Sequence, residues 1–171
     1  TTGSDNKRNV QPILVNHFKG RMALAHNGNL TNSHELRQEL ESRGSIFQTT
    51  TDSEVIAYII VQERLKKGSI EAAVSAAMDR IEGAYSLVLS SPTKLIAARD
   101  VHGFRPLCMG KLKDGSVVFA SESCALDAIG AEFERDIRPG EIVVVDQSGV
   151  RSDTSHCGKA PKKLCVFEFI Y

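Results

Sequence analysis

A short stretch near the start of the chain combines residue types that can bind a ligand through amide groups. Residues 23–31 read ALAHNGNLT, so small and apolar residues lead into His26, Asn27 and Gly28. Glycine and asparagine tolerate backbone conformations that other residues avoid, and a turn made of them leaves backbone N–H groups free to face outward. The pattern predicts a buried strand that ends in a ligand-binding turn. An ordinary strand-to-helix turn is the alternative.

Asp52 and His26 are the next candidates. Asp52 follows a run of threonines and opens a predicted helix, where its carboxylate could bind a cationic group. The helix dipole favours an acidic residue in any first turn, so this position does not require a ligand. His26 could act as a base. A histidine beside a buried strand is more often a structural hydrogen-bonding residue, and we assign it a supporting role.

Two further sets of polar residues, at 99–105 and at 121–123, are better explained by structural roles than by ligand binding. Arg99, Asp100 and Arg105 could form an anion site, but a turn stabilised by salt bridges across a sheet is the preferred interpretation. The sequence SES at residues 121–123 completes no hydrolase triad with a histidine. We expect a strand end and a helix cap there.

The cysteine pattern predicts a reducing compartment, the cytoplasm. No C-x-x-C pair occurs among the four cysteines, which are Cys108, Cys124, Cys157 and Cys165. A chain of this length needs no disulfide framework. A zinc site formed by His156 with the last two cysteines is an alternative, although its spacing matches no common zinc module.

Three helices are predicted between the candidate residues and the middle of the chain. The first covers residues 33–42 behind a capping box of Asn32 and Glu35, and the second opens with a box of Thr51 and Glu54. The third begins after Ser69, and its apolar positions follow the helical repeat from Ile70 to Ile81.

Strands surround these helices in the sequence. Two are predicted early, at residues 13–15 and 22–26. Those after Gly83 read AYSLVLSS, KLIAARD, PLCMGKLKDGSVVFAS, EFERDI and EIVVVD, with a short helix near residues 123–129. The Asp114-Gly115 pair predicts a tight hairpin. Ile142–Val145 is apolar throughout, which indicates burial on both faces, between a second sheet and a layer of helices. The order of strands, three helices and strands favours a layered α+β domain over a βαβ nucleotide fold, and no glycine-rich phosphate loop opens any predicted helix.

Composition restricts the partners of this domain. The 171 residues suffice for one domain with its own core. The 21 basic residues balance 21 acidic ones, which disfavours nucleic acid and anionic membranes as partners. The longest apolar run, residues 55–61, is far too short to cross a bilayer.

The ends of the sequence suggest a fragment of a longer protein. It starts without Met and without an apolar leader, and the polar residues 152–163 indicate a linker after a domain of residues 1–151. Residues 164–171, LCVFEFIY, predict a strand that leads toward a missing partner domain.

Several stretches together resemble one family. They are AHNGNLTN at 25–32, TTTDSEVIAYII at 49–60, ARDVHGFRPL at 98–107, FASESCALD at 119–127 and CVFEFIY at 165–171. In this order they are similar to the glutaminase half of glutamine phosphoribosylpyrophosphate amidotransferases. The HNGN motif is shared with asparagine synthetase and glucosamine-6-phosphate synthase, while CVFEFIY marks the phosphoribosyl branch.

The resemblance implies a four-layer αββα sandwich of the N-terminal-nucleophile hydrolase type, incomplete at its N-terminus, that releases ammonia from glutamine. The family's nucleophile, an N-terminal cysteine with its own amino group as base, is absent from this chain, so we expect the chain alone to be inactive. The Asn27 side chain and the Gly28 N–H would form the oxyanion hole. Asp52 would hold the substrate's ammonium group, with Thr1 and Gly3 at its carboxylate and His26 in support.

In the parent protein, the resemblance implies that this ammonia converts phosphoribosylpyrophosphate to phosphoribosylamine, the committed step of purine synthesis. Glutamine, a phosphoribosyltransferase domain of the same chain and further copies in a homo-oligomer would be the partners. The parent would use Mg²⁺, and in one branch an iron–sulfur cluster with Cys165 as a ligand, whereas this fragment needs no cofactor. The alternatives are an asparagine synthetase-type glutaminase domain and a non-catalytic module for glutamine binding or assembly.

Overall fold

The computed structural model describes residues 7–170. The first half of the chain contains two strands followed by three helices: β1 (Ile13–His17), β2 (Gly20–Leu30), α1 (Ser33–Ser42), α2 (Asp52–Lys66) and α3 (Ile70–Met78). The second half is mostly strands: β3 (Gly83–Ser90), β4 (Leu95–Arg99), β5 (Cys108–Lys111), β6 (Val117–Ala120), α4 (Ser123–Ala128), β7 (Glu132–Asp136), β8 (Ile142–Asp146) and β9 (Gly149–Asp153).

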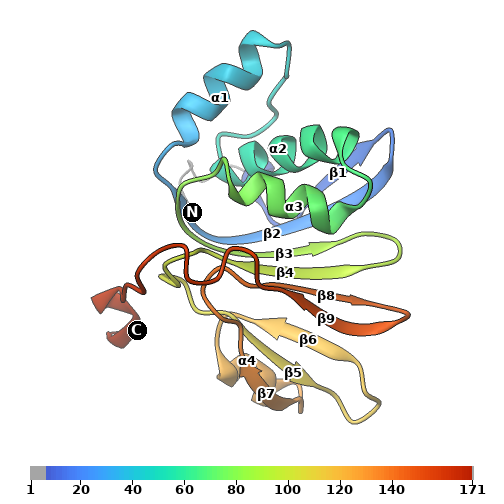
Figure 1. Ribbon diagram of the computed structural model, residues 1–171, viewed down its shortest axis with the longest axis vertical. Helices are drawn as coiled ribbons and strands as arrows, with labels where there is room; N and C mark the ends of the chain where they lie inside the picture. Colours follow the sequence, from blue (N-terminus) through green and yellow to red (C-terminus); the bar gives the residue numbers. More distant parts are fainter. Residues whose placement is uncertain (1–6, 171) are drawn as a thin grey trace.

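The elements form four layers, as predicted (Figure 1). Helices α1–α3 lie on one side of a six-stranded antiparallel sheet with the order β1-β2-β3-β4-β8-β9. A three-stranded sheet with the order β6-β5-β7 lies on its other side, and α4 lies outside that smaller sheet. The order of the layers is therefore helix, sheet, sheet, helix.

Strand β8 shows why the larger sheet is apolar on both faces. Ile142 and Val144 belong to the cluster under the helices, whereas Val143 packs in the cluster between the two sheets. Successive side chains of a strand point to opposite faces, so an apolar run serves two cores at once. The prediction that residues 142–145 are buried on both faces is confirmed for its first three residues.

The smaller sheet alternates in the same way. Met109 of β5 packs between the sheets, while its neighbour Cys108 packs with Leu126 of α4. The hairpin predicted at Asp114-Gly115 joins β5 to β6, and Gly115 has φ +86°. Only glycine adopts such a conformation at little cost.

The helices begin where they were predicted, but three of the four predicted caps are wrong, including the one at residues 121–123, where the N-cap residue Glu122 makes no side-chain cap hydrogen bond. Ser69 does accept a hydrogen bond from the Ala72 N–H, at 3.2 Å. The Asn32 side chain instead joins the Arg80 carbonyl to the Glu82 N–H, so it ties α1 to the end of the α3 region. Tertiary partners compete successfully with the local capping pattern at this position.

The capping box predicted for Thr51 and Glu54 is wrong for a related reason. The Thr51 side chain makes no cap, and the Glu54 carboxylate accepts hydrogen bonds from the N–H groups of Gln48 and Thr49 and from the Thr49 hydroxyl. The carboxylate therefore orders the loop that precedes α2.

Strand boundaries depart from prediction at both ends of the chain. Strand β2 continues through Asn27 and Gly28 to Leu30, so the predicted turn after residue 26 is wrong, because β3 pairs with the whole stretch. Strand β9 was missed, and it includes residues 152–153 of the predicted linker. Val166–Phe169 form a 3-10 helix, so the strand predicted there is also wrong.

The segment between β4 and β5 is a turn organised by Asp100. Its buried carboxylate accepts hydrogen bonds from backbone N–H groups of residues 102–105 and of Tyr85. Arg99 donates to three backbone carbonyls, and Arg105 pairs with Glu168 at 2.9 Å. The structural interpretation is confirmed, with backbone hydrogen bonds in place of most of the expected ion pairs.

Candidate functional site

The candidate residues lie on the last third of β2, where neighbouring side chains face opposite sides of the sheet. His26 lies on the side of Leu24 and Leu30, which belong to the core under the helices. Asn27 lies on the other side, toward the end of β6, where its amide donates a hydrogen bond to the Ser121 hydroxyl at 3.1 Å. Strand alternation therefore gives two adjacent residues different surroundings.

His26 is part of a buried polar cluster. Its Nδ1 lies 3.0 Å from the Ser53 hydroxyl and 3.7 Å from an Asp52 carboxylate oxygen, and His26 is only 5% exposed. Burial lowers the pKa of the imidazole to about 4, although the charge of Asp52 acts in the opposite direction. The ring is therefore neutral near pH 7, which suits a supporting hydrogen-bonding role.

Only one carboxylate oxygen of Asp52 is hydrogen-bonded within residues 7–170. Its Oδ2 accepts a hydrogen bond from the Leu30 N–H at 2.9 Å, which fixes the start of α2 against β2. Its buried Oδ1 has no hydrogen-bond partner among the described residues, and the same holds for Nε2 of His26. Buried polar atoms without partners are uncommon and indicate that an additional group can bind there.

Backbone amides of β2 point in alternate directions. The Thr31 N–H bonds to Glu82, next to β3. The N–H groups of His26 and Leu30 face the opposite edge, where the Gln11 side chain and Asp52 accept them. By the same alternation the Gly28 N–H points to this second edge, beyond the last residue that β1 pairs, Leu24.

Gly28 cannot carry a side chain. It has φ +144°, and a Cβ at this position would lie 2.0 Å from the Ala84 carbonyl oxygen of β3. The close approach of the β3 backbone therefore requires glycine here. This requirement explains the Asn-Gly pair structurally. Gly28 itself is buried, and its N–H faces the edge of β2 that β1 does not pair beyond Leu24.

Asn27 lies in a hollow of about 310 Å³ between the two sheets. The hollow is lined by Gln11, Ala25, His26, Asn27, Ser86, Val88, Leu107, Phe119, Ala120 and Ser121. An amide side chain has two N–H donors, so Ser121 can orient Asn27 through one and leave the second for a ligand.

The structure brings some of the predicted residues together and separates others. Gly28 and Asp52 meet at one edge of β2, because Asp52 binds the amide two residues beyond Gly28. Asn27 lies on the opposite face from His26, and Asp52 lines a different hollow of about 350 Å³ near Arg37. The roles of these residues stay predictions. Thr1 and Gly3 lie outside the described residues.

Three residues near the site were missed from the sequence. Gln11 clamps the backbone N–H and carbonyl of His26, and Ser53 contacts the imidazole. Ser121 was interpreted only as a strand end, although it orients the Asn27 amide. Of these three residues, only Ser53 could have been found from the sequence, because it is adjacent to the candidate residue Asp52.

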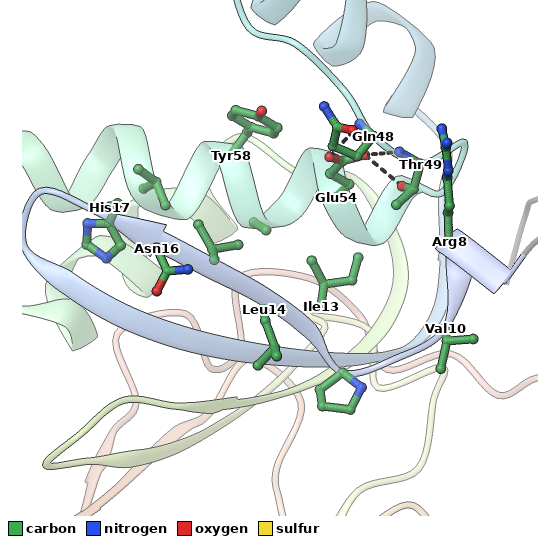
Figure 2. Close-up of a pocket in the computed structure, with 14 residues that line it drawn as sticks. Arg8, Val10, Ile13, Leu14, Asn16, His17, Gln48, Thr49, Glu54 and Tyr58 are labelled. Carbon is green, nitrogen blue, oxygen red and sulfur yellow. Dashed lines mark hydrogen bonds between the residues drawn. The ribbon is translucent and has the colours of Figure 1, made fainter.

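A larger hollow of about 470 Å³ lies between β1 and α2 (Figure 2). Apolar residues such as Ile13 and Leu14 line it together with Glu54 and Tyr58. The carboxylate of Glu54 is already occupied by hydrogen bonds from Gln48 and Thr49 (Figure 2). The Glu54 carboxylate is therefore not free to bind the amide of a ligand in this hollow.

Metal ligands do not gather in the described part of the chain. Residues 7–170 contain no group of three His, Cys, Asp or Glu side chains that could hold a metal ion. His156 pairs with Asp79 at 2.9 Å, which does not fit the zinc alternative. Cys165 likewise has no companion ligands here, so the described residues by themselves do not fit an iron–sulfur cluster. Within the same residues, no helix is long and apolar enough to span a membrane.

Known proteins that resemble this chain are amidotransferases. Amidophosphoribosyltransferase 2 of Arabidopsis thaliana is 45% identical over 171 residues, covering the whole chain and 30% of that protein. Amidophosphoribosyltransferase of Synechococcus elongatus is 45% identical over 175 residues, covering the whole chain and 35% of that protein. The chain thus spans about a third of these relatives. Neither relative favours the asparagine synthetase alternative.

Solved structures agree with the fold. The phosphoribosylpyrophosphate amidotransferase of B. subtilis, in complex with ADP and GMP, matches with a TM-score of 0.90 at 37% identity, over 98% of this chain and 36% of that one. These matches confirm the N-terminal-nucleophile glutaminase fold. Residues 2–128 match the family described as the glutamine amidotransferase domain. The chain therefore belongs to the glutamine amidotransferase domain family.

Proposed function

We propose that this chain is the glutamine-binding part of an amidophosphoribosyltransferase. In that assignment it provides the oxyanion hole and the ammonium site for glutamine hydrolysis, and a phosphoribosyltransferase domain of the parent protein uses the ammonia to convert phosphoribosylpyrophosphate to phosphoribosylamine. The nucleophilic cysteine would come from outside this chain. Mg²⁺, an iron–sulfur cluster involving Cys165, a homo-oligomer and a cytoplasmic location belong to the same proposal for the parent.

The observation that carries the proposal is the edge of β2. The Gly28 N–H and the Asp52 carboxylate lie along this edge, two residues apart on one extended strand, which is about 7 Å. Glutamine has an amide carbonyl at one end and an α-ammonium group at the other, separated by a short side chain. An amide donor and a carboxylate at this spacing complement both groups of one glutamine molecule.

The electrostatics support the same orientation. Oδ1 of Asp52, which has no hydrogen-bond partner among residues 7–170, can accept hydrogen bonds from an ammonium group, and charge-assisted hydrogen bonds of this kind are stronger than neutral ones. A neutral His26 beside it adds no positive charge that would oppose an ammonium group. During hydrolysis, negative charge would develop on the amide oxygen, where the Gly28 N–H and the Asn27 amide would stabilise it.

None of the four cysteines, all of which are among the described residues, lines the hollow at Asn27. Cys108 is buried, with its Sγ on the Ala120 carbonyl. Because hydrolysis of this type requires a thiolate next to its base, we expect binding without turnover.

Titration with two ligands tests the ammonium site. L-glutamine and glutaramate differ only in the α-ammonium group, and we expect glutamine to bind about tenfold more tightly to the native chain. In Asp52→Asn, which keeps the shape of the side chain, this preference should disappear. An unchanged preference in the variant would refute the role of Asp52, whatever the absolute affinity.

A glutaminase assay tests the missing nucleophile. The chain alone should release no ammonia from glutamine, while a version extended upstream of Thr1 should do so. Comparable ammonia release by both versions would contradict the proposal. It would also be contradicted if neither version showed saturable binding of L-glutamine or glutaramate.

A further inference from the structure

Another hollow, of about 330 Å³, lies at the end of β2 that is opposite to Gly28. Three connections meet there: the turn between β1 and β2, the connection between α2 and α3, and the turn between β3 and β4 (Figure 1). Arg21 at this end and Gly28 are seven residues apart on an extended strand, about 20 Å. This hollow is therefore separate from the candidate glutamine site.

The lining of this hollow is strongly basic. It consists of His17, Lys19, Arg21, Arg64, Gly68, Ser69, Ile70, Ser91, Pro92, Thr93 and Lys94. No Asp or Glu is among these residues, although the chain as a whole has equal numbers of acidic and basic residues. Balanced composition makes such a local excess of one sign informative, because like charges around one cavity repel each other unless an anion binds.

Within residues 7–170, most of these cations have no carboxylate partner. Lys94 is the exception, since it pairs with Glu71 at 2.6 Å. Arg64 donates to the Lys67 carbonyl, which leaves its charge uncompensated. Lys19 and Arg21 form no ion pair with any residue between 7 and 170. Three positive charges thus remain available around one concave surface.

His17 adds a neutral donor to this group. Its Nδ1 accepts a hydrogen bond from the Lys19 N–H at 3.2 Å, so the proton of a neutral ring is on Nε2. Burial and the nearby charge of Arg64 both lower the pKa of His17. The Ser91 hydroxyl is occupied by the Lys94 backbone, and the Ser69 hydroxyl oxygen accepts from the Ala72 N–H. The three cations without an ion pair among residues 7–170, together with His17, are the groups on which binding of an anion would mainly depend.

From this arrangement we propose that the hollow at Lys19, Arg21 and Arg64 binds a small molecule through a phosphate or pyrophosphate group. A multiply charged oxyanion can contact several cations at once, and guanidinium groups match phosphate oxygens in geometry. The volume of the hollow is in the range of small-ligand sites. This inference does not depend on glutamine binding at Gly28 and Asp52.

Calorimetric titration of pyrophosphate into the 171-residue chain tests the proposal. We expect saturable binding at one site, and we expect Arg64→Glu and Arg21→Glu each to weaken it about tenfold or more. The matched control is Lys113→Glu, which changes the net charge by the same amount. Lys113 is an exposed residue of the β5–β6 hairpin and does not line this hollow. This control should bind within about twofold of the native chain. Circular dichroism verifies that each variant is folded.

Three outcomes would overturn the proposal. The first is the absence of saturable pyrophosphate binding by the native, folded chain. The second is an equal loss of affinity in Lys113→Glu, which would indicate attraction to net charge alone. The third is binding of succinate, a dianion without phosphate, as tight as that of pyrophosphate. Glutamine affinity should be unchanged in Arg21→Glu, so failure here and failure of the glutamine proposal can be told apart.

Discussion

The two faces of β2 near residue 27 differ in almost every physical property. On the helix side, His26 and Asp52 are nearly fully buried, and the imidazole is neutral because burial lowers its pKa to about 4. On the other side, Asn27 is exposed at a hollow, and its amide donates a hydrogen bond to the Ser121 hydroxyl. One strand thus separates a buried polar cluster from an exposed amide side chain.

This difference suggests that neighbouring residues have different roles, one in stabilising the fold and the other in contacting a ligand. The buried cluster fixes the position of the strand edge through Leu30 and the His26 backbone. The open side presents a donor that a ligand can reach. Buried groups should therefore control stability, with Asp52 also serving the proposed ammonium site, whereas Asn27 should control chemistry with little effect on stability. The following predictions test this division, from the largest expected change in stability to the smallest.

Gly28→Ala should give the largest loss. The added Cβ would lie 2.0 Å from the Ala84 oxygen, and the backbone conformation at φ +144° disfavours a side chain. We expect the free energy of unfolding to fall by more than about 4 kcal/mol, measured by denaturant titration. Gly20→Ala on the same strand is the control, because Gly20 also has positive φ but open space around it. Its cost should be near 1 kcal/mol, and equal losses would contradict the collision argument.

Asp52→Ala should cost about 1–3 kcal/mol. It leaves the buried Leu30 N–H without its acceptor, and an unsatisfied buried donor is expensive. Glu35→Ala removes an exposed acidic residue from the corresponding first turn of α1, so it controls for the helix dipole. If both variants lose the same stability, the dipole alone explains the effect of Asp52.

The neutral His26 should make stability depend on pH in a defined window. Its pKa is about 4 in the folded chain and near 6.5 when unfolded, so the unfolded state binds more protons between these values. The free energy of unfolding should therefore decrease as pH falls from about 6.5 toward 4. Glu71 and Glu141, with pKa values lowered to about 2 by their hydrogen bonds to basic side chains, weaken the fold only at lower pH.

Denaturant titrations at several pH values measure this slope. In His26→Asn the decrease between pH 6.5 and 4.5 should become shallower, with the remainder arising from groups such as His17. A slope equal to that of the native chain would show that His26 does not control this window.

Asn27→Ala should have the smallest effect on stability, within about 0.5 kcal/mol, because the side chain is exposed. In a version extended upstream of Thr1, the same substitution should reduce glutaminase activity about 10²–10³-fold. Ser121→Ala should reduce activity less, since it only orients the amide. A large loss of stability in Asn27→Ala, without loss of activity, would reverse the proposed division.

Local patterns predicted the elements that depend on local energetics. The helix starts, the Asp114-Gly115 hairpin and the double-sided burial of Ile142–Val144 follow from periodicity and turn chemistry, and all are confirmed. Errors occurred where a distant partner decided the outcome. Asn32 binds near Arg80 rather than capping its own helix, and β2 passes through Gly28 because β3 pairs with it.

The sequence by itself determined the family resemblance, the order of helices and strands from β1 to β8 and the identity of the candidate amides, because these depend on residue types and short-range spacing. Only the tertiary structure decided that Asp52 reaches the strand edge beside Gly28, that Gln11 and Ser121 hold His26 and Asn27, and that basic residues from three connections surround one hollow. These contacts join residues far apart in the chain. Their geometry follows from sheet register and layer packing, which no local pattern encodes.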